Sequence, residues 1–113
     1  MRWLRVDLGS IRNLAGFVVK HAGAGGLSRS FNTRAFHIRV STDGLNWRRV
    51  VDVRRNTDDV SRHKIRPSAA RFVQLFVNTP AQTGRAPARI YDLEVLEAAP
   101  VQAAASGAAA GSR

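Results

Sequence analysis

The apolar residues of this chain recur at every second position in short runs, and this alternation restricts its fold more than any other feature. In the run WLRVDLGS (residues 3–10), Leu4, Val6 and Leu8 alternate with charged residues. A period of two gives a strand one buried face and one solvated face. The first 97 residues contain no stretch with the 3.6-residue period of an amphipathic helix. The sequence therefore predicts an all-β domain.

Six further runs continue this pattern, and residues that favour turns separate them. The seven predicted strands cover residues 3–10, 14–20, 36–41, 47–53, 60–65, 71–78 and 90–96. Gly9-Ser10 is expected to end the first strand, and Asp43-Gly44 supplies residues that accept a positive φ in a tight hairpin. Seven short strands favour an antiparallel β-sandwich. Long polar loops often carry binding residues, and the candidates are residues 21–34, 54–59 and 79–89.

Composition limits the classes of protein to which the chain can belong. The 113 residues can hold one small core, and the lack of cysteine excludes disulfides and cysteine-based zinc sites. The formal net charge is +10, but only Lys20 and Lys64 of the 18 basic residues are lysines. Two interpretations stay open: the codon usage of a GC-rich genome, or a basic surface for an anionic partner. No phosphate-binding loop, nucleophile motif or motif-placed pair of acids occurs in the sequence, so no enzyme is expected.

The composition changes at Ala98. Residues 1–97 are the predicted folded domain, and residues 98–113 predict a flexible tail or linker rich in alanine, glycine and serine. The N-terminus lacks the apolar segment of a secretory signal, so a literal start at Met1 would leave the chain in the cytoplasm. Strand-like sequence follows Met1 directly, which suggests instead a start inside a longer domain.

Five segments, in this order, carry a resemblance to a known family: WLRVDLGS, VVKHAGAGG, NTRAFHIRVSTDGLNW, RFVQLFV and ARIYDLEVL. Together they resemble the discoidin domain, also called the coagulation-factor C-type domain, which includes galactose-type carbohydrate-binding modules attached to bacterial glycoside hydrolases. The resemblance implies an eight-stranded antiparallel jelly-roll β-sandwich of the galactose-binding-like type, with ligand-binding loops at one end and no catalysis. It also implies further strands before Trp3, so the domain is expected to be N-terminally truncated, and it places Trp3 and Trp47 in the core.

The same resemblance implies a sugar site. In sugar-binding members, a histidine at the end of an early strand and an arginine in a later loop contact the ring, which matches His21 and either Arg54 or Arg55. Planar polar side chains can bond adjacent hydroxyls in pairs, and an aromatic ring can cover the C–H face of a sugar. The alternative is structural, because asparagine, histidine and arginine also brace loop backbones. The predicted ligand-binding residues are His21, Phe31, Asn32, Arg34, Arg54, Arg55 and Asn56.

The resemblance further implies a structural calcium ion, with an acidic residue of the last strand beside it, which matches Asp92. Calcium takes six to eight oxygen ligands, and one carboxylate cannot hold it. Weak or absent binding of Ca²⁺ is therefore expected. The alternative for Asp92 is a solvated carboxylate or an ion pair with Arg89.

The leading hypothesis is a noncatalytic carbohydrate-binding module from a longer, secreted protein. It would bind a galactose-type glycan and hold an attached glycoside hydrolase domain at its polysaccharide or glycoconjugate.

Two other classes of partner stay open. Loop residues could dock on the anionic phospholipid of a membrane or cell surface, and the residues proposed for this are Leu27, Arg29, Phe31, Arg34 and Arg85. A basic nucleic-acid-binding domain is the third hypothesis, and it would use Arg39, Arg48 and Arg62. Nucleic acid is the least favoured partner, because we expect no aromatic residues interleaved with these arginines.

Overall fold

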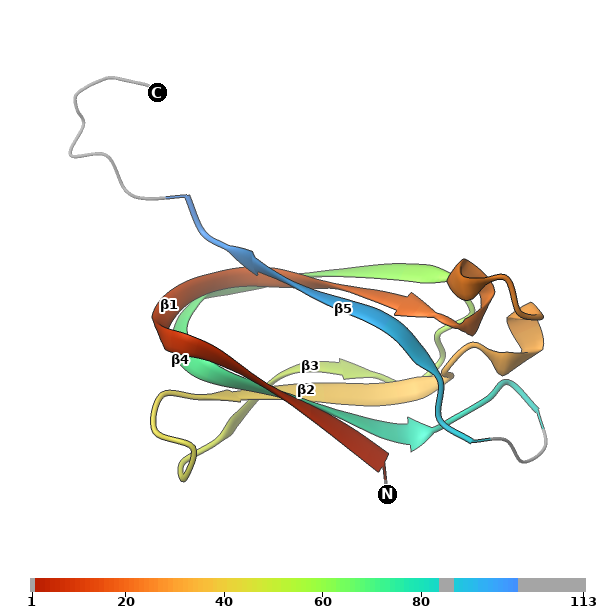
Figure 1. Ribbon diagram of the computed structural model, residues 1–113, viewed down its shortest axis with the longest axis horizontal. Coiled ribbons are helices and arrows are strands. Elements are labelled where there is room, and N and C mark those ends of the chain that lie inside the picture. The colour runs from red at the N-terminus through yellow and green to blue at the C-terminus, as the bar shows by residue number, and fades with distance from the viewer. Residues whose placement is uncertain (1, 84–86, 100–113) are drawn as a thin grey trace.

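The computed structural model describes residues 2–83 and 87–99, and it contains five antiparallel strands (Figure 1). The long strands are β1 (Arg2–His21) and β4 (Val60–Thr79), and the short strands are β2 (Ala35–Ser41), β3 (Arg48–Val53) and β5 (Ile90–Glu97). Two 3₁₀ turns, η1 (Ala22–Gly25) and η2 (Arg29–Phe31), lie between β1 and β2. The predicted all-β class is confirmed. Most of the predicted tail, residues 100–113, lies outside the described residues and stays a prediction.

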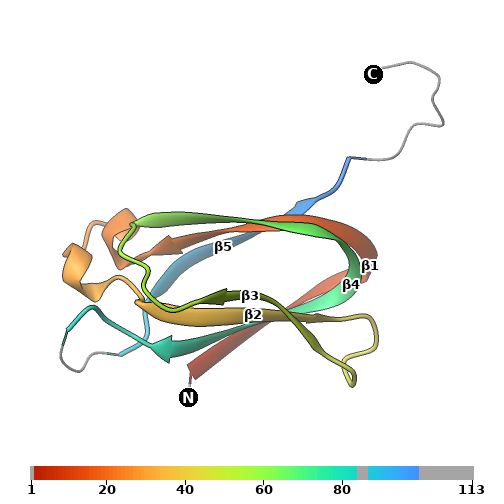
Figure 2. The ribbon, with the colours of Figure 1, turned by 180° about the vertical axis from the view of Figure 1, so that it is seen from behind.

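β1 and β4 bend together, so that one hydrogen-bonded sheet with the order β3-β2-β4-β1-β5 folds over into two layers (Figures 1 and 2). Residues 2–7 of β1 pair with residues 72–77 of β4, and the same part of β4 carries β2 and then β3. We call this the four-strand layer. Residues 16–20 of β1 pair with residues 60–64 of β4 and with β5, which makes the three-strand layer. The predicted antiparallel sandwich is confirmed.

Two predicted strand ends are wrong, and bends replace them. Gly9 does not end the first strand: it takes a φ of +85°, and the register between β1 and β4 shifts between Asp7 and Arg12. The predicted strands 60–65 and 71–78 are likewise one strand, β4, and Pro67 lies inside it. A second register shift there leaves residues 65–67 of β4 without paired residues in β1. Such irregularities bend a strand and increase its twist without ending it. The seven predicted strands are therefore five.

The core lies between the layers and follows the alternation of the sequence. Phe36, Ile38 and Val40 of β2 are fully buried against inward-pointing residues of β1 and β4. Leu4 of β1 is only partly buried, because none of the described strands pairs with the outer edge of residues 2–7. Trp3 is 56% exposed and points away from the core, so the expected core position of Trp3 is wrong.

Three loops gather at one end of the sandwich: residues 22–34, residues 54–59, and the described parts of the third loop, residues 80–83 and 87–89 (Figure 1). The opposite end carries the loop between β2 and β3. There Asp43 accepts hydrogen bonds from the backbone N–H groups of Leu45 and Asn46, at 2.8 Å each. Among the described residues, no helix is long and apolar enough to cross a membrane.

Candidate functional site

A buried asparagine joins two of the three loops. Asn32 is fully buried, and its side-chain oxygen accepts a hydrogen bond from the backbone N–H of Gly23 at 2.7 Å. Its amide donates to Asp59 Oδ1 at 2.9 Å and to the carbonyl of Thr57 at 3.3 Å. Asn32 thus braces the loop end and presents no surface to a ligand in this conformation.

A second asparagine has the same part in the neighbouring loop. Asn56 is 6% exposed, and its amide donates to the carbonyl of Thr33 at 2.9 Å. The side chain of Gln82, from the third loop, donates to the carbonyls of Asn32 and Asn56, at 2.9 Å each. The described parts of all three loops are therefore tied together by buried or half-buried amides.

His21 lies in the core rather than on the rim. Its side chain is fully buried, its ring centroid is 5.4 Å from that of Phe36, and Nε2 is hydrogen-bonded to Ser61 Oγ at 2.9 Å. The hydroxyl of Ser61 also bonds Nε2 of His63 at 2.8 Å. Burial lowers the pKa of His21 to about 4, and the neighbouring His63 acts in the same direction. His21 is therefore neutral near pH 7 and does not reach the surface.

The other four predicted site residues differ in their exposure. Arg34 is half-buried, and its backbone N–H donates to the carbonyl of Thr79 at 3.0 Å. Phe31 is half-buried, and the Arg89 guanidinium lies over its ring at 4.5 Å. Arg54 and Arg55 are both exposed. The structure thus places all seven predicted residues at the loop end, but it buries His21, Asn32 and Asn56.

Of the residues proposed for membrane docking, those that the structure describes do not form a broad apolar tip. Leu27 is 49% exposed, whereas Phe31 lies beneath Arg89. Arg85 lies outside the described residues. Docking on a membrane stays a prediction.

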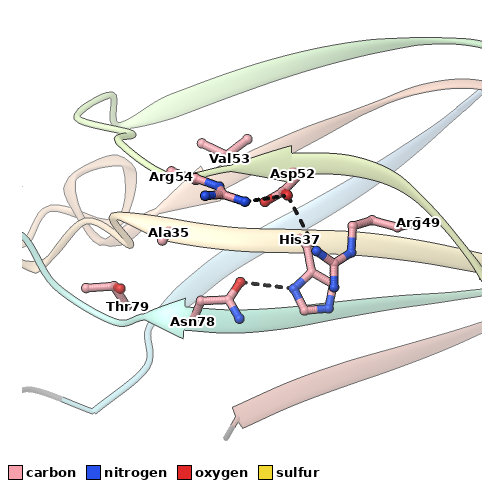
Figure 3. A pocket seen from close by; sticks show the side chains of 8 residues that line it. All are labelled: Ala35, His37, Arg49, Asp52, Val53, Arg54, Asn78 and Thr79. Carbon is pink, nitrogen blue, oxygen red and sulfur yellow. Dashed lines mark hydrogen bonds and ion pairs between the residues drawn. The ribbon is translucent and has the colours of Figure 1, made fainter.

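A shallow cavity of about 370 Å³ opens on the outer face of the four-strand layer, next to the loop end (Figure 3). Figure 3 shows Arg49 and Arg54 on either side of Asp52, with nitrogen to oxygen distances of 3.4 and 3.7 Å. His37 Nδ1 donates to Asn78 Oδ1 at 3.0 Å. The eight residues that line the cavity are Ala35, His37, Arg49, Asp52, Val53, Arg54, Asn78 and Thr79.

Chemically, this cavity suits a polar ligand. Two guanidinium groups share the single carboxylate of Asp52, so positive charge remains for a ligand oxygen. The amide of Asn78 and the hydroxyl of Thr79 add neutral donors and acceptors at the rim. Of the predicted site residues, only Arg54 lines this cavity. The sequence did not point to most of the others because they lie on strands, whereas ligand contacts were expected in the loops.

Aromatic and arginine side chains cover the rest of this outer face. The Arg39 guanidinium lies 4.8 Å from the ring centroid of Trp47 and 4.7 Å from that of Phe76. Arg5 lies over Trp47 at 5.3 Å and over Phe72 at 5.0 Å. The expected core position of Trp47 is therefore wrong, because its ring is half-buried between two arginines on the outer face. The expectation that no aromatic residue accompanies Arg39 is also wrong.

Asp92, the predicted calcium ligand, lies beside a lysine side chain. It is exposed on β5, and its carboxylate is 3.9 Å from the ammonium of Lys20, which also pairs with Glu94 at 3.1 Å. The part of the chain that the structure describes contains no cluster of three or more histidine, cysteine, aspartate or glutamate side chains suited to a metal. A cation beside the ammonium of Lys20 would be repelled, so the described residues around Asp92 do not fit Ca²⁺.

Two bent layers with three braced loops at one end define an antiparallel jelly-roll β-sandwich domain. The family model of the F5/8 type C domain matches residues 1–91, and the chain belongs to this family. The resemblance to the discoidin domain is thereby confirmed. A search of curated proteins finds no match.

Solved structures with this fold include carbohydrate-binding modules. The family 32 carbohydrate-binding module of Streptococcus pneumoniae EndoD is 27% identical, with a TM-score of 0.75 over 85% of this chain and 69% of that one. CpGH89CBM32-5 from Clostridium perfringens, in complex with GalNAc-β-1,3-galactose, is 20% identical. Its TM-score is 0.66, and the match covers 83% of this chain and 64% of that one. Chitosan-binding module 2 from a Paenibacillus chitosanase/glucanase, in complex with chitotriose, is 21% identical. Its TM-score is 0.64, and the match covers 83% of this chain and 68% of that one. The chain spans about two thirds of the length of these domains.

Proposed function

We propose that this domain is a noncatalytic carbohydrate-binding module that holds an associated glycan-active enzyme at its polysaccharide or glycoconjugate. Its similarity to the EndoD module supports a carbohydrate ligand. Tethering raises the local concentration of a linked catalytic domain at the polymer without any new contact. The proposal places the parent protein outside the cell, where such polymers are found.

The cavity of Figure 3 is the observation that carries this proposal. Donors from β2, β4 and Arg54 converge on an open hollow whose neighbouring loops are fixed by Asn32 and Asn56. A preformed site loses little entropy when it binds a ligand. The hollow is shallow and offers few hydrogen bonds, so a single sugar unit is expected to bind with a free energy of roughly −4 to −6 kcal/mol.

Within this proposal, the predicted residues divide into two groups. His21, Asn32 and Asn56 hold the loops and the adjoining core in place, and Arg54 contacts the ligand. Arg54 is exposed and free to reorient, since its pairing with Asp52 at 3.7 Å is a solvent-exposed ion pair of small net value. A ligand hydroxyl or carboxylate can therefore compete for this guanidinium.

A glycan array, followed by calorimetric titration of the best ligand, tests this assignment. Arg54→Ala should weaken binding about tenfold, because a hydrogen bond to a charged group is lost. Arg55→Ala is the matched control, since Arg55 is the next residue, equally charged and exposed, and does not line the cavity. It should bind like the unchanged protein. Failure of the folded domain to bind any glycan would contradict the proposal, and an equal loss in both variants would move the site away from the cavity.

A further inference from the structure

Basic side chains cross the four-strand layer in one transverse row on its outer face. The strand register sets Arg49 of β3 opposite Arg39 of β2, Arg39 opposite Gln74 of β4, and Gln74 opposite Arg5 of β1. Neighbouring strands lie about 4.8 Å apart, so this row, which we call the arginine row, spans roughly 14 Å. It contains three arginines and no acidic residue.

Arg49 and Arg39 lie directly opposite each other, and like charges in this arrangement destabilise a sheet. Arg49 has Asp52 as its partner at 3.4 Å. Within residues 2–83 and 87–99, neither Arg39 nor Arg5 has an acidic group within 4.0 Å. Arg39 instead donates through Nε and Nη2 to one neutral oxygen, Gln74 Oε1, at 3.2 and 3.1 Å. These neutral contacts leave the positive charge of Arg39 and Arg5 without an acidic partner among the described residues, and a local arrangement that costs stability in this way is expected at a functional site.

Aromatic rings hold these guanidiniums in fixed positions. Arg39 packs between Trp47 and Phe76, and Arg5 packs between Trp47 and Phe72, with distances to the ring centroids of 4.7 to 5.3 Å. Because the side chains are already ordered, an anionic ligand would bind them at a smaller entropic cost. The guanidiniums also cover faces of these rings, which leaves less of them for the stacking of nucleic-acid bases.

The neighbouring row of the same face adds features suited to a sugar. The register aligns Asp52, His37, Phe76 and Trp3 across β3, β2, β4 and β1. Asp52 and His37 line the cavity at one end of this row, and Trp3, which is 56% exposed, stands at the other end. His37 stacks on Phe76 between them, with ring centroids 4.9 Å apart. The exposed indole of Trp3 can cover the C–H face of a sugar ring, and the cavity can take hydroxyls.

We propose that the arginine row binds an acidic polysaccharide, a chain of carboxylate-bearing sugars that lies across the strands from the cavity to Trp3. This inference rests on the proposed function and adds the charge class of the glycan. The N–H groups of Arg5, and those of Arg39 that do not bond Gln74, can donate to a carboxylate of the ligand. The sugar units between the carboxylates contact Trp3 and the cavity. Arg39 and Arg5, which have no acidic partner among the described residues, thus acquire one in the ligand.

The experiment compares one polymer with and without its carboxylates. Polygalacturonate and its carboxyl-reduced, neutral form are titrated into the domain at two salt concentrations. The domain should prefer polygalacturonate, and high salt should reduce this preference, because exposed charges are screened. Arg39→Gln and Arg5→Gln should each weaken the binding of polygalacturonate about tenfold while leaving that of the neutral polymer unchanged.

Arg62→Gln is the control variant. It makes the same change in net charge on β4, at an exposed residue opposite Val18 in the three-strand layer. Its affinity for polygalacturonate should stay within about twofold of the unchanged protein, and a tenfold loss would overturn the inference in favour of diffuse attraction by net charge. Thermal unfolding confirms that each variant is folded, and Arg5→Gln tests the row alone if Arg39→Gln does not fold.

The other outcomes are also decisive. Equal affinity for the acidic and the neutral polymer would overturn the acidic class but leave the proposed function standing. Binding to neither polymer nor to any glycan of the array would remove both. Tighter binding of a polyuridylate chain than of polygalacturonate at equal charge concentration would overturn the inference and assign this face to nucleic acid.

Discussion

Acid should destabilise this domain through His21. The ring is fully buried, and Nε2 is bonded to Ser61 Oγ, whereas Nδ1 has no hydrogen-bond partner among the described residues. Protonation would place a charge in the core beside Phe36 and add an N–H without an acceptor. For this reason, burial lowers the pKa of His21 from 6.5 to about 4.

The size of the effect follows from that difference in pKa. Below pH 6.5, the unfolded chain takes up a proton at His21, but the folded chain does not until the pH reaches about 4. The unfolded state therefore binds more protons in this window, and the free energy of unfolding falls as the pH falls through it. One pKa unit corresponds to about 1.4 kcal/mol, so the loss from this group is about 3 kcal/mol in total. Below pH 4, the group contributes no further loss.

The assay is urea unfolding, followed by tryptophan fluorescence, at intervals between pH 7 and pH 4. His21→Gln keeps a hydrogen-bonding side chain but has no group that titrates in this window. The decrease in the free energy of unfolding should be about 3 kcal/mol smaller in this variant than in the unchanged protein. The proton resonances of the His21 ring should titrate with a midpoint well below 6.5. A midpoint near 6.5, or identical pH profiles for the two proteins, would refute the reasoning.

Two further substitutions test the packing that positions the candidate site. Asn32→Ala should lower the free energy of unfolding by about 2 to 3 kcal/mol in urea titrations, because the part-buried N–H of Gly23 loses its acceptor and Asp59 keeps only Arg29 as a partner. A loss under about 0.5 kcal/mol would show that the loops are not joined there. Gly16→Ala should lower the free energy of unfolding by about 1 to 3 kcal/mol, since the added Cβ would lie 2.6 Å from the backbone oxygen of His63. An unchanged melting temperature would contradict that close approach.

The strand pattern could be predicted because burial repeats with the geometry of a single strand. Phe36, Ile38 and Val40 point inward as their alternation requires, whatever the partner strand is. The bends could not be predicted in the same way. Gly9 is compatible with a strand end and with a bend, and only continued pairing of β1 with β4 distinguishes them. The sequence therefore indicated seven strands where the fold has five.

The candidate site was harder to predict, since the exposure of a polar residue depends on distant partners. His21 and Asn32 have the local sequence of loop ligands, yet partners 40 and 27 positions away bury them. Those partners lie in β4 and in the loop before it, and no local signal points to them. A polar residue in a loop is compatible with both roles.

The sequence by itself determined the all-β class, the inward face of each strand and the family, because these follow from local alternation and from short motifs. The tertiary structure alone decided which side chains meet. The register of four strands aligns Arg49, Arg39 and Arg5 across the sheet, although Arg5 is far from the other two along the chain. A shift of one residue in any strand would turn its arginine to the opposite face. Register depends on the energy of the whole sheet, which is why no single segment of the sequence records it.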